Sequence, residues 1–361
     1  MDLKKTPLFF EHEKLGAQMA AFGGWLMPIQ YSGILNEHIW TRNKTSVFDI
    51  CHMGEFLLKA DPVKSGLDRI LTVNLKDMPC GKCRYTSMLN EKGGIIDDLI
   101  VYQIKPDEWM LVVNAATTAA DEGNLRGHLF KDVDLKNVSS KIGKLDLQGP
   151  FSREVLNSIV GSQINKLKYY TFDYFDILGE KNIISRTGYT GELGYEIYLS
   201  NPKIKELWEL LLKNKLVKPA GLGARDTLRL EMGYSLYGQD IDQDITPLEA
   251  GMERYLDFNK DFIGKDALLG QRKKGLTRNL VSFVTASRRS ARHNYKIWAK
   301  DREIGFVTSG SFAPSLGVSI GMGYVKNSVK KGDKIILKDN NVEIEATITD
   351  KPFYKNSSLR S

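Results

Sequence analysis

The sequence predicts an α+β protein that ends in an all-β domain. Between Val47 and Val113, short runs of apolar and β-branched residues alternate with helical stretches, which is typical of a mixed α/β region. From Leu280 onwards, short strands follow one another between Gly, Asn and Asp turns, which favours a small β-barrel or sandwich. We expect the mixed region to occupy residues 1–265 and the all-β domain residues 275–361.

Helices are expected where apolar residues recur at helical spacing or where a glycine turn leads into such a stretch. The candidates, in order, are Leu8–Phe22, Ile34–Asn43, Thr117–Phe130, Lys203–Asn214 and 221–233. The Gly-Trp-Pro stretch between the first two is expected to form a turn. The polar stretch GQRKKGLTR at 270–278 is expected to link the two regions.

Strands are expected in short runs rich in β-branched and aromatic residues. In the mixed region these runs are 54–60, 83–90, 94–102, 108–115, Lys144–Leu147, Asn182–Arg186 and 194–200. In the all-β domain they are 280–286, 302–310, 319–325, 333–338 and 342–350.

The composition is that of an ordinary soluble protein, with 361 residues of which 42% are hydrophobic and 26% are charged. No apolar run approaches the ~18 residues that a membrane helix needs, so no membrane span is expected. The first residues, MDLKKTPLFFEHEKLG, lack the apolar core of a signal peptide. A cytoplasmic location is therefore expected.

The net charge of +7 suits an anionic ligand or an acidic partner. Basic residues gather in one stretch, SRRSARHNYK at 287–296, which is interpreted either as a solvated loop or as a docking patch for an acidic protein. No basic motif is interleaved with aromatic residues, so a nucleic-acid partner is not expected.

Cysteine and histidine do not predict a metal site. The chain has three cysteines, Cys51, Cys80 and Cys83. This low, odd number argues against a disulfide framework and favours a reducing compartment. The CxxC of Cys80 and Cys83 has no second pair to complete a zinc site, so it is interpreted as a chance occurrence in a loop. The His residues show no paired spacing, and no metal is expected.

Two adjacent carboxylates interrupt a predicted strand in NEKGGIIDDLIVY, residues 90–102. Because side chains alternate along a strand, Asp97 and Asp98 point to opposite faces. If either face is buried, one aspartate is buried with it, and a buried carboxylate needs hydrogen-bond donors or a chemical role. The alternative is that both aspartates are exposed to water, because they lie near the start of the strand beside a turn.

A series of motifs in fixed order makes the chain similar to a known family. They are TPLFFEH at 6–12, FGGWLMPIQYSG at 22–33, VFDICHMGE at 47–55, NEKGGIIDDLIVY, LVVNAA at 111–116, LDLQGP at 145–150, SRTGYTGELGYEIY at 185–198, GLGARDTLRLEMGYSLYGQDI at 221–241, TPLEAGM at 246–252, DFIGKDAL at 261–268 and TSGSFAPSLGVSIGMGYV at 308–325. Together they resemble the aminomethyltransferase of the glycine cleavage system, the T-protein, from about residue 5 to residue 355.

The resemblance implies a fold and a reaction. The fold is a three-lobed cloverleaf, with two intertwined mixed α/β subdomains that bind folate and a C-terminal all-β barrel. The enzyme takes the aminomethyl carbon from the lipoyl arm of H-protein and transfers it to tetrahydrofolate, releasing ammonia and forming 5,10-methylenetetrahydrofolate. Tetrahydrofolate is then a co-substrate, H-protein is the partner, and a monomer is expected.

The resemblance also assigns site residues. The second aspartate of the pair, Asp98, is the implied catalytic residue, and Asp97 is structural. Glu196 and Arg225 are implied to hydrogen-bond the pterin, since a carboxylate accepts from its amidine-like edge and a guanidinium donates to its carbonyl. Further implied pocket residues are Asn114, Tyr189 and Met53, followed by Tyr170 and Tyr85.

Two alternatives stay open on the same scaffold. One is another folate-dependent one-carbon enzyme, such as a demethylase of dimethylsulfoniopropionate or the folate domain of dimethylglycine or sarcosine oxidase. The other is the non-enzymatic folate-binding factor of iron–sulfur cluster assembly, whose KGCYxGQE-like signature is replaced here by RTGYTGELGYE. The segment MERYLDFN at 252–259 departs from the family pattern, and Tyr255 is expected to replace a usual tryptophan.

The basic stretch at 287–296 falls at the entry to the predicted barrel domain. H-protein is acidic in this family, so Arg292 and its neighbours are expected to help dock it.

Overall fold

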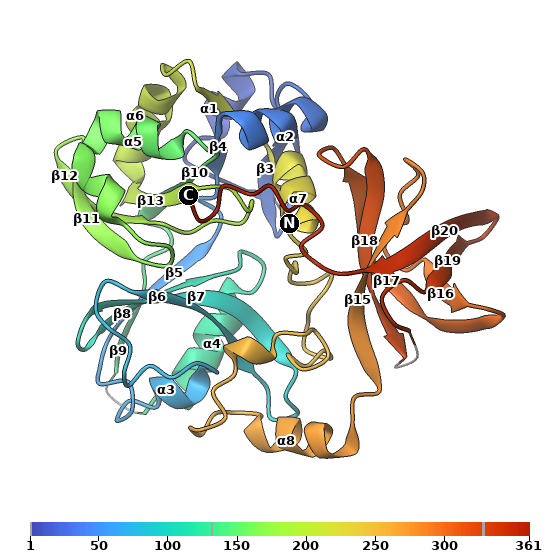
Figure 1. Cartoon of the computed structure of the whole chain (residues 1–361). Helices are drawn as coiled ribbons and strands as arrows, with labels where there is room; N and C mark the ends of the chain where they lie inside the picture. The colour runs from blue at the N-terminus through green and yellow to red at the C-terminus, as the bar shows by residue number, and fades with distance from the viewer. Residues whose placement is uncertain (1, 131–132, 327–328) are drawn as a thin grey trace.

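The chain forms three lobes, which the computed structural model describes over residues 2–130, 133–326 and 329–361 (Figure 1). The predicted three-lobed cloverleaf and α+β class are confirmed. Two lobes are built on open sheets and the third is a closed barrel. None of the described helices is long and apolar enough to cross a membrane.

The first lobe contains a six-stranded sheet in the order β11-β12-β13-β10-β4-β14. Its strands are β4 (Thr45–Asp49), β10 (Ile142–Gln148), β11 (Phe172–Ile177), β12 (Glu180–Ser185), β13 (Gly194–Ser200) and β14 (Val217–Pro219). Around it lie α1 (Phe9–Lys14), α2 (Ile34–Asn43), α5 (Ser152–Val160), η1 (Ser162–Lys166), α6 (Asn201–Leu212) and α7 (Leu222–Glu231). A small sheet of β1 (Lys4–Lys5), β3 (Trp25–Gln30) and β2 (Gln18–Phe22) completes it.

The second lobe is an antiparallel five-stranded sheet in the order β6-β7-β8-β5-β9. Its strands are β5 (Gly54–Lys59), β6 (Cys83–Leu89), β7 (Ile95–Lys105), β8 (Glu108–Val113) and β9 (Asp134–Asn137), with α3 (Leu67–Ile70) and α4 (Thr118–His128) packed on it. The chain enters this lobe after β4 and leaves it before β10, so the two lobes are intertwined in sequence.

A long connection after α7 returns to the second lobe before it reaches the barrel. It contains η2 (Glu253–Tyr255) and α8 (Lys265–Lys274), which lies beyond α4 at the lower edge of Figure 1. Its Ile241, Ile245 and Leu268 pack with Ile95 in one apolar cluster. The connection therefore covers the end of β7 where the aspartate pair lies.

The third lobe is a closed six-stranded barrel in the order β15-β18-β17-β16-β19-β20. Its strands are β15 (Arg278–Thr285), β16 (Lys296–Ala299), β17 (Arg302–Ala313), β18 (Val318–Lys326), β19 (Lys334–Asp339) and β20 (Val342–Thr349). Of the two predicted architectures, barrel and sandwich, the structure shows the barrel. Its strand β16 was not predicted from the sequence.

Two sequence predictions are wrong. The helix expected over Leu8–Phe22 ends at Lys14, because Gly16 adopts a left-handed φ of 69°, and Gln18–Phe22 forms β2 instead. The Gly-Trp-Pro stretch expected as a turn is mostly strand β3, and only Gly23 and Gly24 make the hairpin turn between β2 and β3.

The expected linker at 270–278 is also partly helical, since α8 continues to Lys274. Its last turn carries Arg272, Lys273 and Lys274, and cations are favourable at the negative end of a helix. The polar residues at 270–274, which indicated a linker, belong to the exposed end of α8.

The C-terminal segment leaves the barrel and runs back across α7 to the first lobe, as the dark red trace in Figure 1 shows. The backbone N–H groups of Phe353 and Tyr354 both donate to the carbonyl of Glu231 at 2.9 Å. Ser358 donates to the Glu192 carboxylate through its backbone N–H at 3.1 Å. This segment joins the barrel, α7 and the loop before β13.

A buried arginine lies beneath that segment. Arg42 of α2 donates to Glu192 at 2.7 Å and to Glu231 at 2.8 Å, and its guanidinium stacks on the ring of Tyr354 at 4.2 Å from the centroid. Both carboxylates are almost completely buried. One cation thus neutralises two carboxylates from different elements and joins α2, α7 and the C-terminal segment.

We predict that Arg42→Ala lowers the free energy of unfolding by about 3–5 kcal/mol, because removing one partner leaves buried charges uncompensated. Urea denaturation followed by circular dichroism measures this. The matched control is Arg126→Ala, which breaks an exposed pair with Glu122 on α4 and should cost less than about 1 kcal/mol. Equal losses in the two variants would contradict the assigned role of Arg42.

Candidate functional site

The aspartate pair lies on β7, which is covered on both faces. Asp97 has 0% of its surface exposed, and Asp98 is half-buried on the opposite face. The alternative that both carboxylates remain in water is therefore wrong. On the face of Asp97, α4 and apolar residues of the long connection cover the strand. On the face of Asp98 lie Tyr255 of the same connection and the first lobe, so alternation buries a carboxylate on each side.

Asn114 holds both carboxylates from the end of β8, the strand next to β7. Its side-chain Nδ2 donates to Asp97 Oδ1 at 2.8 Å and to Asp98 Oδ1 at 3.0 Å. Its backbone N–H donates to Asp97 Oδ2 at 3.0 Å. Asn114 was predicted as a pocket residue, and it orients the aspartate pair.

The Asp98 carboxylate receives a second donor from β6. The Tyr85 hydroxyl donates to Asp98 Oδ2 at 2.8 Å, and the ring of Tyr85 packs edge-on against Tyr255 with centroids 4.6 Å apart. Tyr85 and Asp98 are diagonal neighbours on paired strands, which brings long side chains into reach. Tyr255, expected to replace a tryptophan, thus supports the donor of Asp98.

Burial and, after it, the nearby charge of Asp97 raise the pKa of Asp98 to about 7. The hydrogen bonds from Tyr85 and Asn114 act in the opposite direction, because they stabilise the ionised form. Asp98 therefore changes its charge near neutral pH, which suits a group that exchanges a proton or stabilises a developing cation.

A second group of charges lies across from β7 on the first lobe. Glu196 of β13 is 4% exposed and accepts from Lys144 Nζ at 3.1 Å and from the Thr187 hydroxyl at 2.6 Å. Burial alone would raise the pKa of Glu196, but the Lys144 ammonium and the Thr187 hydroxyl lower it below its ordinary value. Glu196 is thus held as an anion.

Asp146 of β10 lies directly opposite Glu196 in the sheet. Two like charges in that position repel one another, and Arg225 of α7 forms an ion pair with Asp146 that offsets this. Burial raises the pKa of Asp146 to about 6, with Arg225 lowering it and Glu196 raising it. The two carboxylates and two cations form one neutral, almost water-free cluster.

The two groups are linked across the two lobes by side chains on one face of β7. Asp98 and Tyr102 share one face of β7, about 13 Å apart along the strand. The Tyr102 hydroxyl lies 3.4 Å from Glu196 Oε2. Tyr189 lies beside the second group, where its ring contacts the Arg225 guanidinium.

Aromatic and apolar side chains lie beside the charged residues of the second group. The Arg225 guanidinium lies 5.1 Å from the centroid of the Tyr189 ring, which stacks on Tyr234 at 5.8 Å. Met53 and Tyr170 pack in one apolar cluster, and Lys144 Nζ lies 3.7 Å from the Met53 sulfur. Flat faces and a polarisable sulfur suit a flat, polar ring as ligand.

The structure thus brings together the residues predicted for the pocket, and Arg292 lies apart from them, exposed in the loop before β16. Lys144 and Asp146 are site residues that the sequence reasoning missed. Their signal was available in KLDLQ at 144–148, where polar residues alternate with leucines and so share one strand face.

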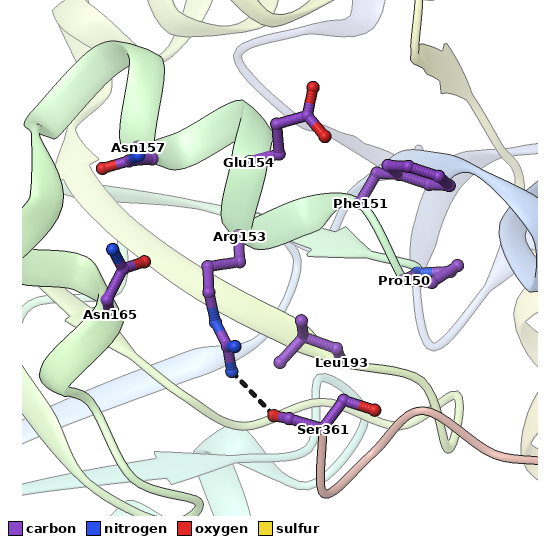
Figure 2. A pocket seen from close by; sticks show the side chains of 8 residues that line it. All are labelled: Pro150, Phe151, Arg153, Glu154, Asn157, Asn165, Leu193 and Ser361. Atoms are coloured by element: carbon purple, nitrogen blue, oxygen red, sulfur yellow. Dashed lines mark hydrogen bonds between the residues drawn. The ribbon is translucent and has the colours of Figure 1, made fainter.

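The described residues contain no group of three or more His, Cys, Asp or Glu side chains that could hold a metal ion. Cys51 and Cys83 are buried free thiols, and Cys80 is an exposed one. An open pocket of about 420 Å³ beside α5 shares no lining residue with the site; Figure 2 shows Arg153 there, donating to the carbonyl oxygen of Ser361 at 2.7 Å.

The fold and the site define a class of protein. An intertwined pair of α/β lobes with a terminal barrel encloses a cluster of charges and tyrosines suited to a flat heterocycle, with one carboxylate that titrates near neutral pH. These are the features of an enzyme that acts on a bound heterocyclic co-substrate.

Comparison with known proteins identifies the family. Residues 8–260 match the GCVT N-terminal domain, and residues 278–355 match the glycine cleavage T-protein C-terminal barrel domain. The aminomethyltransferase of Thermotoga maritima is 41% identical over 99% of this chain and 100% of its own length, and that of Halothermothrix orenii is 43% identical over 97% and 100%.

The crystal structure of glycine cleavage system aminomethyltransferase T from Bartonella henselae superposes with a TM-score of 0.92 at 34% identity, covering 99% of both chains. The chain therefore belongs to the glycine cleavage T-protein family, and it is a tetrahydrofolate-dependent aminomethyltransferase.

We predict that Tyr85→Phe raises the pKa of Asp98 above its value of about 7, because it removes a hydrogen bond that stabilises the carboxylate. The carboxyl ¹³C signal of Asp98, assigned by its loss in Asp98→Asn, reports the titration. Tyr174→Phe, which alters an exposed tyrosine of β11, is the control and should leave that signal unchanged. An unchanged Asp98 pKa in Tyr85→Phe would contradict the proposed contact.

Proposed function

We propose that the chain takes its aminomethyl group from the lipoyl arm of H-protein and that Asp98 acts at the reacting amine of tetrahydrofolate. The transferred carbon loses its bonds to the lipoyl sulfur and to the amino nitrogen, which leaves as ammonia. It gains bonds to two folate nitrogens, giving 5,10-methylenetetrahydrofolate and a dihydrolipoyl arm. The observation that carries this proposal is the half-buried Asp98 carboxylate, held by two donors and titrating near neutral pH.

The role of Asp98 follows from its fixed geometry. Tyr85 and Asn114 each donate to one of its oxygens, so the carboxylate cannot rotate freely. The remaining lone pairs can accept a hydrogen bond or a proton from the folate amine. Its negative charge then stabilises the positive charge that develops on that amine and on the transferred carbon, and no reorganisation is needed during the reaction.

Glu196 and Arg225 are proposed to hold the pterin ring. Glu196 is kept ionised by Lys144 and Thr187, so it can accept from the amidine-like edge of the ring. Arg225 retains donors beyond its contact with Asp146 and can donate to the ring carbonyl. Tyr189 would pack against the ring, and Met53, Asn114 and Tyr170 would complete the pocket.

H-protein is the proposed partner, and the loop at 287–296 is its proposed docking surface. Arg292 is exposed there and forms no ion pair with any carboxylate in the described part of the chain. The neighbouring His293 contacts the carbonyl of Thr308, whose hydroxyl donates to the buried Asp240. Asp240 in turn pairs with Arg229 of α7, so this loop adjoins the helix that carries Arg225.

The comparisons with full-length aminomethyltransferases favour this proposal over a different folate-dependent demethylase and over an iron–sulfur assembly factor. The monomeric state, the cytoplasmic location and the boundaries of residues 1–265 and 275–361 stay predictions.

We predict that Asp98→Asn lowers folate-dependent ammonia release from aminomethyl-loaded H-protein by ~10²–10⁴-fold, the usual contribution of a positioned acid–base group. In wild type, the rate should fall as the pH drops below about 7, because Asp98 then becomes protonated. Asp107→Asn, an exposed aspartate between β7 and β8, should keep the wild-type rate. A rate within threefold of wild type in Asp98→Asn would remove Asp98 from the mechanism.

We also predict that Arg292→Glu weakens H-protein binding by about tenfold at low salt, with a smaller difference at high salt because exposed charges are screened. Titration calorimetry at two ionic strengths measures both quantities. Lys215→Glu, which reverses an exposed cation after α6, is the control. If Arg292→Glu binds H-protein with wild-type affinity and wild-type salt dependence, the loop at 287–296 is not the docking surface.

A further inference from the structure

A third carboxyl group lies behind the aspartate pair and has no role in the reaction described above. Asp121 lies in the first turn of α4 and has 0% of its surface exposed. Neither of its side-chain oxygens has a well-formed hydrogen bond in the described part of the chain. The Thr117 hydroxyl is close enough to lower the pKa of Asp121, but it donates to the carbonyl of Asn114 instead. A buried carboxylate left without donors is costly, so its state requires an explanation.

The partner of Asp121 is another acid. Its carboxyl faces that of Asp97, also 0% exposed, and neither forms an ion pair with any cation of the described residues. The other titratable groups that act on this region are Asp98, Asp242 and the phenol of Tyr237. Two adjacent buried carboxyls without a cation cannot both be ionised, so the stable arrangement is a hydrogen bond with one proton between them.

We propose that Asp121 is a positioning residue for aminomethyl transfer: it shares one proton with Asp97, and this pair fixes Asn114, which in turn holds Asp98. The inference rests on the proposed role of Asp98 and adds the layer of residues behind it. Asp121 has 0% of its surface exposed, so it acts only through its neighbours.

The contacts form a continuous path. Both oxygens of Asp97 accept from Asn114, one from the side-chain amide at 2.8 Å and one from the backbone N–H at 3.0 Å. The same amide nitrogen then reaches Asp98 Oδ1 at 3.0 Å. If Asp97 turns away, the amide of Asn114 loses its anchor and Asp98 loses one of its two donors.

The shared proton also fixes the charge behind the site. With one proton the pair carries a single negative charge, and with none it carries two. A second charge would make the ionised form of Asp98 less stable and would raise its pKa. The pair therefore keeps Asp98 able to ionise near neutral pH while it supplies a rigid acceptor to Asn114.

The test compares two replacements of similar size. Asp121→Asn can still donate to Asp97 and leaves the pair with one charge, so its rate of folate-dependent ammonia release should stay within about threefold of wild type. The acid limb of its pH–rate profile should also stay in place. Asp121→Leu fills the space without a hydrogen bond and should lose tenfold or more. Glu122→Gln changes the next acid on α4, which pairs with Arg126 and Asn137, and should match wild type.

Three outcomes would overturn the proposal. Equal activity in the Leu and Asn variants would mean that Asp121 only fills space. A shift of the acid limb to lower pH in Asp121→Asn would mean that wild type carries two charges there. A loss of tenfold or more in Asp121→Asn would mean that the shared proton is not what matters, and this readout stands even if Asp121→Leu fails to fold.

Failure of the role proposed for Asp98 can be distinguished from failure of the role proposed for Asp121. If Asp98→Asn keeps its activity, the assigned role of Asp98 fails regardless of Asp121. The ¹³C titration of Asp98 in Asp121→Asn then still tests the shared proton by itself: an Asp98 pKa equal to that of wild type supports one charge on the pair, and a lowered pKa contradicts it.

Discussion

The site depends on one constraint, which is that strand β7 is covered on both of its faces. The alternation of side chains then places one aspartate of the pair on each buried face, and both need donors. Asn114 supplies them to both carboxylates and Tyr85 supplies one to Asp98 alone. The two chemically identical residues therefore differ in surroundings: Asp97 faces another acid, whereas Asp98 lies on the face of β7 that is turned toward the first lobe.

On the first lobe, the residues that face β7 are organised by charge balance. Glu196 and Asp146 lie side by side on paired strands, and Lys144 and Arg225 neutralise them from β10 and α7. Because α7 is also held by Arg42 through Glu231, and the C-terminal segment binds the same residue, the position of Arg225 depends on contacts from the first lobe and from the end of the barrel. The three-lobed arrangement is thus part of the site.

Much of the fold could be predicted because the strands of the second lobe and of the barrel show clear composition and turn signals. The error at Leu8–Phe22 arose because apolar spacing was compatible with a helix, while the left-handed Gly16 decided the outcome. Local sequence could not decide between Asp97 and Asp98, because alternation along a strand does not show which face is turned toward the site. Only the resemblance to the family selected Asp98. Lys144 and Asp146 alternate visibly with leucines in KLDLQ, but the sequence does not show that Glu196 and Arg225 lie beside them. Asp121 was missed because its neighbour Asp97 belongs to another element.

The most direct test of the account is a crystal structure of the chain with tetrahydrofolate bound. We predict that the pterin ring lies between the two groups of charges, with its amidine-like edge on Glu196, its carbonyl near Arg225 and its reacting amine within hydrogen-bond distance of Asp98. Tetrahydrofolate bound elsewhere, or bound here with Asp98 directed away from the reacting amine, would contradict it.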